Sequence, residues 1–287
     1  MKNIILKGGL GNQIFQYAFA NYVRDQGFEV CLNSKSLLST GRANDFLDEI
    51  FFDVKIHGKR INKNNGVDNN PLLKCYRILK EVFSINKVYK ENVEKSISLQ
   101  ELESFNTFNG YWQSTKYIKK FKINLNPRNI IFQEIFPEER SGYLAMHLRL
   151  GDYSKPKNQM IHGTMPMKYY EKALLHIISR KKIRKLILFS DSPIIAKEKI
   201  KKLLIKNELI TVIDFESFPF KDFEDFEEMY LMSLFENLII SNSTFSYWSA
   251  ILGNSSKTVI APNIWYADKS MQEILAPRLR QNLWTYL

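Results

Sequence analysis

The chain has 287 residues, of which 45% are hydrophobic and 25% are charged, a composition typical of a soluble globular protein. This length allows a large buried core and favours two domains. No window approaches the roughly 20 apolar residues that a membrane span needs, and the N-terminus lacks a signal-peptide core. Cys31 and Cys75 are too few for a disulfide framework. We therefore expect a reducing compartment and a cytoplasmic location.

The formal net charge of +11 comes largely from lysines in short clusters, such as residues 181–185 and 197–202. A basic chain fits nucleic acid, an anionic membrane surface or a phosphorylated substrate. The basic residues are scattered and no nucleic-acid-binding module is present, so we expect no nucleic-acid partner. Solvated lysine-rich faces are the simpler explanation, and weak peripheral attraction to the inner face of a membrane stays open.

The first 32 residues predict a βαβ unit. Residues 3–7 are β-prone, and the glycine-rich turn at 8–11 separates them from apolar residues at helical spacing between Ile14 and Tyr22. Gly27 stands where a helix ends, and residues 28–32 predict the next strand.

The middle of the chain is less regular. Residues 55–70 are polar and predict a long surface loop, and residues 72–83 have a helical pattern. Pro127 and Pro137, followed by charged residues, indicate a domain boundary. We expect an N-terminal domain over 1–138 and a C-terminal domain over 139–287.

The second half alternates strands and helices, which is typical of a parallel α/β sheet. The expected strands are residues 143–149, 185–190, 209–215, 238–241 and 258–261. The expected helices are residues 168–180, 194–205, 222–236 and 246–252. The fold class is therefore α/β, with two Rossmann-like doubly wound domains facing a cleft, and ligands are expected beyond the carboxyl ends of the strands.

The turn at residues 8–13 lies between a strand and a helix, where backbone N–H groups bind phosphate. A nicotinamide site is disfavoured, because Ile14 replaces the third glycine and Asn33 ends the next strand without an acid. The turn either brings Asn12 and Gln13 into a cleft or is only structural.

His147 and Arg149 lie on one face at the end of an expected strand, and Asp152 follows on the next turn. A guanidinium at this place can grip a phosphate through two hydrogen bonds. Asp152 can orient the arginine, bind a sugar hydroxyl or act as a base. A plain Arg149–Asp152 salt bridge is an equal alternative.

A second polar turn precedes the expected helix at 246–252. Hydroxyls and free N–H groups at a helix start form an anion site, and four small polar residues exceed what one N-cap requires. The residues are Asn242, Ser243, Thr244 and Ser246, preceded by Ser241. The acids at 222–228 are best explained by a solvated helix face, although Asp225 or Glu228 can face the site.

A metal site is not expected. The four histidines show no ligand spacing, and no Asp-x-Asp pair is present to carry a divalent cation. Arg149, the hydroxyls and the helix dipole would then neutralise a phosphate leaving group without metal.

Four motifs together resemble the bacterial α-1,2-fucosyltransferases of glycosyltransferase family 11. They occur in family order: GGLGNQIFQYA from residue 8, HLRLGDY from 147, FSDS from 189 and NSTFSYW from 242. The resemblance implies a metal-independent, inverting GT-B enzyme without a cofactor. It would transfer L-fucose from GDP-fucose to the 2-hydroxyl of a galactose in a glycan acceptor.

The resemblance also implies that the N-terminal domain lies on the acceptor side and that the C-terminal domain binds the GDP-sugar. It further implies roles for single residues. Arg149 contacts the diphosphate, and His147 lies at the nucleotide end. Asp191 is near the guanosine, and Asn12 and Gln13 approach the sugar-phosphate. The phosphate site is lined by Asn242, Ser243, Thr244 and Ser246. Asp152 is the candidate catalytic base.

Three other functions stay open. They are a related GT-B transferase with another GDP-sugar or linkage, a non-catalytic nucleotide-sugar or glycan-binding protein, and the disfavoured nicotinamide oxidoreductase. The sequence leaves the acceptor, the pathway and the oligomeric state open. Tyr111, Trp112 and Gln113 either line the acceptor site or pack in the core, and core packing is favoured.

Overall fold

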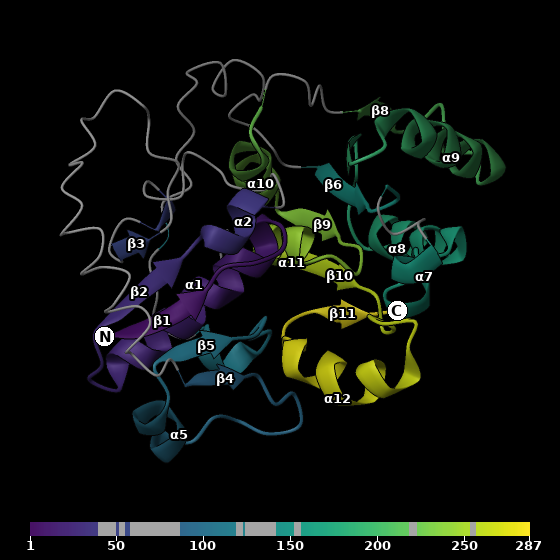
Figure 1. Cartoon of the computed structure of the whole chain (residues 1–287). Coiled ribbons are helices and arrows are strands. Elements are labelled where there is room, and N and C mark those ends of the chain that lie inside the picture. Colours follow the sequence, from purple (N-terminus) through teal and green to yellow (C-terminus); the bar gives the residue numbers. More distant parts are fainter. Residues whose placement is uncertain are drawn as a thin grey trace. The chain divides into compact units, whose positions relative to one another are not determined.

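The protein is described by a computed structural model that covers residues 1–39, 50–51, 55–57, 87–118, 123, 142–151, 156–217, 223–252 and 257–287. The chain divides into two compact units, Met1–Asn124 (unit 1) and Leu125–Leu287 (unit 2), each with its own parallel sheet (Figure 1). The expectation of two α/β units is confirmed. The boundary expected at residue 138 lies outside the described residues.

Unit 1 has a five-stranded sheet in the order β3-β2-β1-β5-β4, with every pair parallel. Its elements are β1 (Lys2–Ile5), α1 (Leu10–Asp25), β2 (Val30–Asn33), α2 (Lys35–Ser39), β3 (Lys55–His57), β4 (Val88–Lys90), α5 (Leu99–Ser104), β5 (Thr107–Asn109) and the 3₁₀ turn η1 (Thr115–Tyr117). The βαβ opening is confirmed, and Gly27 takes a left-handed φ of 89° just after α1.

The loop expected from residue 55 is wrong for its first three residues, which form β3. Ile56 pairs with Leu32 of β2, so a single apolar residue between two polar ones suffices for an edge strand. The rest of that loop and the helix expected at 72–83 lie outside the described residues.

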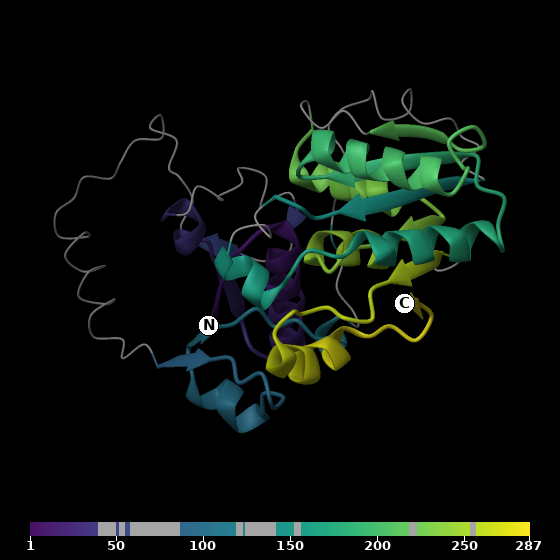
Figure 2. The same ribbon diagram turned by 90° about the vertical axis from the view of Figure 1, so that its right-hand side faces the viewer.

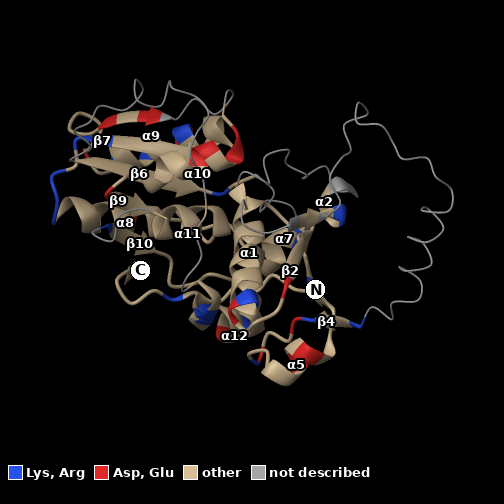
Figure 3. Ribbon diagram, turned by 90° about the vertical axis from the view of Figure 1, so that its left-hand side faces the viewer, with Lys and Arg blue, Asp and Glu red and all other residues tan. Residues whose placement is uncertain are grey.

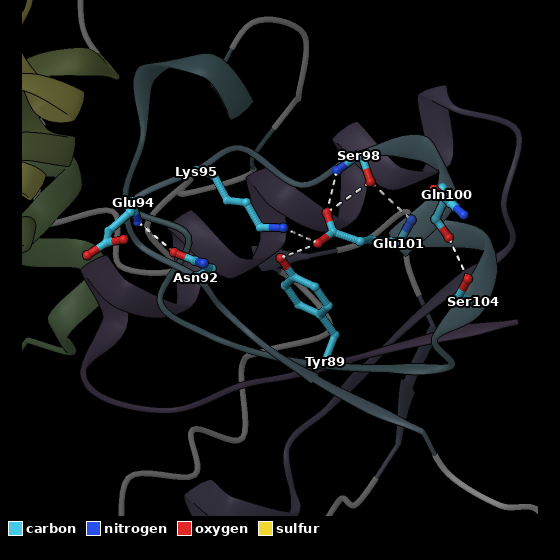
Figure 4. Close-up of polar contacts among 8 residues, drawn as sticks. All are labelled: Tyr89, Asn92, Glu94, Lys95, Ser98, Gln100, Glu101 and Ser104. Carbon is cyan, nitrogen blue, oxygen red and sulfur yellow. Dashed lines mark hydrogen bonds and ion pairs between the residues drawn. The ribbon is translucent and has the colours of Figure 1, made fainter.

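Helix α5 begins with a capping box. The Ser98 hydroxyl accepts a hydrogen bond from the Glu101 amide (3.2 Å), and Glu101 Oε2 accepts one from the Ser98 amide (2.8 Å) (Figure 4). Lys95 Nζ lies 2.8 Å from Glu101 Oε1, and this hydrogen bond is the main reason why the pKa of Glu101 is lowered to about 2. The cap therefore closes on an ionised carboxylate.

Unit 2 has a six-stranded sheet in the order β11-β10-β9-β6-β7-β8, again with every pair parallel. Its elements are β6 (Tyr143–Leu148), α7 (Pro156–Ile161), α8 (Met167–Ile178), β7 (Lys185–Ser190), α9 (Pro193–Lys206), β8 (Asp214–Ser217), α10 (Asp225–Ser233), β9 (Asn237–Ile239), α11 (Thr244–Ile251), β10 (Thr258–Ala261), α12 (Lys269–Leu279) and β11 (Thr285–Tyr286).

Helices cover both faces of the unit 2 sheet, as expected for a doubly wound fold. Leu144, Met146 and Leu148 of β6 share a core with buried residues of α8 and α9 on one face (Figure 2). The alternate residue His147 turns to the other face, where its ring lies 5.4 Å from that of Phe245 in α11. This alternation decides which side chains reach the site.

The strand expected at 209–215 is wrong over its first five residues. Glu208, just after α9, has a left-handed φ of 58°, and the Leu209 amide donates to the Leu204 carbonyl (2.8 Å). The amides of Val212 and Ile213 then donate to the Leu209 carbonyl. The apolar residues of this stretch therefore form a turn, and β8 begins only at residue 214.

The charged residues of unit 2 lie mostly on its surface. Lys197, Lys199, Lys201 and Lys202 are exposed on α9, and acids gather at the start of α10 (Figure 3). A solvated face thus accounts for the lysine cluster, whereas in the acidic cluster Glu227 is buried and Glu228 is half-buried. Among the helices within the described ranges, none is long and apolar enough to cross a membrane.

Candidate functional site

The site of unit 2 lies where the sheet order changes direction. Strands β6 and β9 are neighbours in the middle of the sheet, and the chain winds outward from them in opposite directions. Loops diverge at the carboxyl ends of two such strands, which makes this switch point the usual ligand position in an open α/β sheet. The loop after β6 carries Arg149, and the turn after β9 carries Ser241–Ser243.

Asp191, at the carboxyl end of β7, holds the loop that follows β6. Its Oδ1 accepts hydrogen bonds from the amides of Leu150 (2.9 Å) and Gly151 (3.1 Å). Its Oδ2 accepts a second one from Gly151 (3.0 Å) and lies 3.1 Å from Arg149 Nε. A Cβ atom on Gly151 would lie 2.6 Å from Oδ2, so any other residue there would displace this carboxylate.

Arg149 is therefore oriented by Asp191, through its Nε atom. The expected partner Asp152 lies outside the described residues, so its role as an ion-pair partner or base stays a prediction. The side chains of Arg149 and Asp191 are 29% and 22% exposed. A fixed, partly open guanidinium can meet an anion without having to be ordered first.

His147 lies beneath the surface, at only 3% exposure. Its Nδ1 is 2.8 Å from the Ser241 hydroxyl, which ties β6 to the turn after β9. Burial, and to a lesser extent the charge of Arg149, lowers the pKa of His147 to about 3. The ring is neutral at neutral pH, so it positions its neighbours and adds no positive charge for a phosphate.

The turn before α11 contains two residues that hold it together. The fully buried Ser246 hydroxyl donates to the carbonyls of Ser241 (3.4 Å) and Ser243 (3.3 Å). The buried side-chain amide of Asn242 donates to three backbone carbonyls, those of His162, Gly163 and Trp265.

The other two hydroxyl residues of this turn lie at the helix start itself. Ser243 is the N-cap, and its hydroxyl accepts from the Phe245 amide (3.3 Å). Thr244, which is half-buried, opens the first helical turn. A helix N-terminus at a switch point is suited to an anion, because its first N–H groups and its dipole attract negative charge. Contact of either residue with a donor stays a prediction.

The glycine-rich turn of unit 1 is also held by specific side-chain contacts. Gly8 has a φ of 80°, and a Cβ there would lie 2.6 Å from Asn12 Nδ2. Asn12 Oδ1 accepts from Gln113 Nε2 (2.7 Å), and Gln13 Nε2 donates to the Gly8 carbonyl (2.9 Å). The buried Gln13 Oε1 has no hydrogen-bond partner among the residues that the structure describes. Contact of Gln13 with a donor sugar stays a prediction.

Sequence reasoning missed Gln16, which joins this turn to the strand beside it. Gln16 accepts from the Lys7 amide (2.9 Å) and donates to the carbonyls of Lys7 and Gly110 (both 3.2 Å). The sequence signal was a glutamine one helical turn after Asn12 and Gln13, at a helix position where an apolar residue is usual. The structure buries its amide fully, so it needs hydrogen-bond partners.

Glu228 is a further acidic candidate, on α10, which packs against α11. Burial, with a smaller contribution from the charge of Asp225, raises the pKa of Glu228 to about 9. Its carboxyl group is protonated at neutral pH and can donate a hydrogen bond, which the solvated-face explanation did not foresee for this position.

Within the described part of the chain, no three or more His, Cys, Asp and Glu side chains gather in a way that could hold a metal ion. The expected independence of metal stays a prediction.

Comparison with known proteins gives one family and two full-length relatives. The model described as "Glycosyl transferase family 11" matches residues 1–287. The chain is 25% identical over 311 residues to the O-antigen biosynthesis glycosyltransferase WbnK of Escherichia coli, covering 94% of this chain and 96% of that protein. It is 29% identical over 290 residues to an alpha-1,2-colitosyltransferase of Escherichia coli, covering 93% and 92%.

One solved structure, a glycosyltransferase from Rickettsia africae, aligns over 100% of this chain and 84% of its own. The identity is 12% and the TM-score is 0.38.

Proposed function

Since the chain belongs to glycosyl transferase family 11, we propose that it transfers L-fucose from GDP-fucose to the 2-hydroxyl of a galactose in a glycan acceptor. The observation that carries the proposal is the Arg149 guanidinium, fixed by Asp191 at the switch point of the unit 2 sheet. The α-1,2 linkage named for one relative and the O-antigen role named for the other support the linkage and a polysaccharide acceptor.

The proposed reaction is a single displacement with inversion. The acceptor oxygen forms a bond to the anomeric carbon of fucose while the bond from that carbon to the GDP oxygen breaks. The electron pair of the broken bond leaves with GDP, and the acceptor proton passes to a base. Since this proton leaves late in the reaction, a weak base such as the carboxylate of Asp152 suffices.

Stabilisation of the leaving GDP is the larger contribution. Arg149 and the N-terminus of α11, with Ser243 and Thr244, place positive charge and N–H donors where the diphosphate gains charge. Neutral His147 is hydrogen-bonded to Ser241 and so fixes the distance between the end of β6 and the turn after β9. Asn12 and Gln13 in unit 1 bind the sugar-phosphate. No metal ion takes part in this proposal.

A second donor is favoured by one observation, the alpha-1,2-colitosyltransferase among the relatives. Colitose is L-fucose without its 3-hydroxyl. A site that hydrogen-bonds the 3-hydroxyl discriminates strongly against colitose, by about 10⁴-fold or more, whereas an apolar pocket there does not. The ratio of kcat/KM for the two GDP-sugars therefore decides between the two donors.

The test is direct. The purified full chain is incubated with GDP-fucose or GDP-colitose and a panel of galactose-terminated oligosaccharides, with and without a chelator, and the linkage of the product is determined. We expect an α-1,2-fucosylated product that the chelator leaves unchanged. Loss of activity with chelator would refute the metal-free mechanism. GDP binding without transfer or donor hydrolysis would indicate a binding protein instead.

A further inference from the structure

The loop at residues 109–113, which we call the Tyr111 loop, follows β5 at the carboxyl edge of the unit 1 sheet. In the sheet order β3-β2-β1-β5-β4, strand β5 pairs directly with β1. This loop and the glycine turn after β1 therefore lie side by side at the carboxyl edge, where open parallel sheets gather ligands. The sequence left Tyr111 between the acceptor site and the core, and none of the roles assigned above uses the side chains of Lys7 or Asn109.

The loop is held in a strained conformation. Trp112 has a left-handed φ of 57°, which is unfavourable for a bulky residue and persists only where the surroundings enforce it. Glu91 Oε2 accepts hydrogen bonds from the amides of Tyr111 (2.7 Å) and Trp112 (2.9 Å). The Trp112 ring is buried and stacks on Phe19 at 3.8 Å.

Gly110 completes this arrangement, because a Cβ atom there would lie 2.5 Å from Glu91 Cβ. The loop therefore sends consecutive side chains to opposite sides. Trp112 enters the core, as the sequence favoured, whereas Tyr111 stays 44% exposed. The strained backbone thus leaves the Tyr111 side chain on the surface of unit 1.

Polar groups surround the displayed ring. Lys7 Nζ lies 4.4 Å from the centre of the Tyr111 ring and donates to Asn109 Oδ1 (2.8 Å). A lysine ammonium has three donors, so this bond leaves it capacity for hydroxyl groups. Asn109 donates no hydrogen bond from its side-chain amide to any residue that the structure describes. The patch thus combines an apolar ring with several N–H donors.

We propose that the Tyr111 ring and the Lys7–Asn109 pair bind a pyranose ring of the acceptor glycan. A sugar ring presents an apolar face of C–H groups and a rim of hydroxyls, and it needs both an aromatic surface and fixed polar groups. Lys7 can also meet a phosphate, but a phosphate has no apolar face for the Tyr111 ring. That the sugar is the acceptor's galactose rests on the proposed function.

The test uses methyl β-D-galactopyranoside as the probe and the full chain. Saturation-transfer NMR is expected to detect its binding to the wild type and to Tyr111→Phe, but not to Tyr111→Leu, which keeps apolar bulk and loses the ring. In the transfer reaction, Tyr111→Leu is expected to raise the acceptor KM about tenfold, the loss expected from one aromatic contact. The KM for GDP-fucose is expected to stay unchanged.

Phe28→Leu is the matched control, because Phe28 also lies under a lysine, with Lys2 Nζ 4.9 Å from its ring, but precedes β2 at the amino end of the sheet. It is expected to bind the galactoside like the wild type. An unchanged acceptor KM in Tyr111→Leu, or an equal rise in the GDP-fucose KM, overturns the inference. Galactoside binding that depends on Tyr111 in a protein without transferase activity supports it and refutes the proposed function alone.

Discussion

At the scale of single residues, the main effect of the Arg149–Asp191 pair is to orient the guanidinium, and its contribution to the stability of the fold is small. Both side chains are partly exposed, and such pairs contribute roughly 1 kcal/mol or less. The carboxylate also accepts from two backbone amides, so it fixes the loop and the arginine together. The arrangement presents the guanidinium in one orientation at the carboxyl edge of the sheet.

Replacing Arg149 with lysine should lower kcat by about 10²-fold or more, as loss of a preorganised donor does elsewhere. Lysine keeps the charge but loses the planar fork and the contact through Nε. Steady-state kinetics with GDP-fucose measure the effect, and Arg180→Lys, at the exposed end of α8, is the control. An Arg149→Lys enzyme with near-normal turnover would refute the assignment.

His147 should make the protein sensitive to acid. Its folded pKa of about 3 lies below the ordinary 6.5, so below pH 6.5 the unfolded state binds a proton that the folded state does not. Its contribution to stability is thus lost as the pH falls from 6.5 towards 3, with a slope of up to about 1.4 kcal/mol per pH unit.

The measurement is the free energy of unfolding in urea between pH 7 and pH 4. His147→Asn, which can keep a hydrogen bond to Ser241, should show a shallower fall than the wild type, and His176→Gln should behave like the wild type. Equal slopes in His147→Asn and the wild type would contradict the buried neutral ring.

The sequence placed His147 and Arg149 on one face but could not identify Asp191 as the arginine's partner. That pairing depends on β7 lying beside β6, which is a property of the sheet and not of local spacing. Asp152, three residues from Arg149, was the partner that spacing suggested, and this pairing stays a prediction because Asp152 lies outside the described residues. Gln16 and Glu228 were missed because burial by distant elements gives them their properties.

At the scale of elements, the loop after β6 depends on the absence of a side chain at Gly151. Gly151→Ala should displace the Asp191 carboxylate and lower kcat/KM about tenfold or more, because small misplacements of a binding group are costly. The double mutant tests the cause. In an Asp191→Ala background, Gly151→Ala should have no further effect, and additive losses would contradict the proposed contact.

The capping box of α5 should contribute to stability and not to activity. Ser98→Ala should lower the free energy of unfolding by about 1 kcal/mol, while Ser104→Ala, which loses only a bond to the Gln100 carbonyl, should cost less (Figure 4). Because the pKa of Glu101 is lowered to about 2, its contribution is present above pH 4.5 and lost as the pH falls towards 2. Equal losses in the two variants, measured by urea unfolding, would refute the cap.

Elements with strong apolar patterns were predictable, and short ones were not. The strands at 185–190 and 258–261 agree with the structure residue for residue, because each is a buried apolar run bounded by polar residues. At 209–213 the same composition forms a turn, because hydrogen bonds to the end of α9 compete with strand formation. The edge strands β3 and β11 are too short to show the two-residue alternation of a strand in the sequence.

At the scale of the whole molecule, each parallel sheet gathers candidate residues at its carboxyl edge. In unit 2 they lie at the switch point formed by β6 and β9, beside Arg149 and the start of α11, and in unit 1 they follow the neighbouring strands β1 and β5, in the glycine turn and at Tyr111. The alternation of strands and helices predicted two α/β units, but the order of the strands, and hence the switch point of unit 2, follows only from the structure.

The central claim is that the GDP part of the donor binds at the switch point of unit 2. Amide hydrogen exchange with and without GDP tests it most directly, because it locates the bound nucleotide without needing the acceptor. We predict slower exchange in peptides that contain residues 147–151 and 241–246, and loss of this protection in Arg149→Lys. Protection confined to residues 8–13, or none in unit 2 at saturating GDP, would contradict the claim.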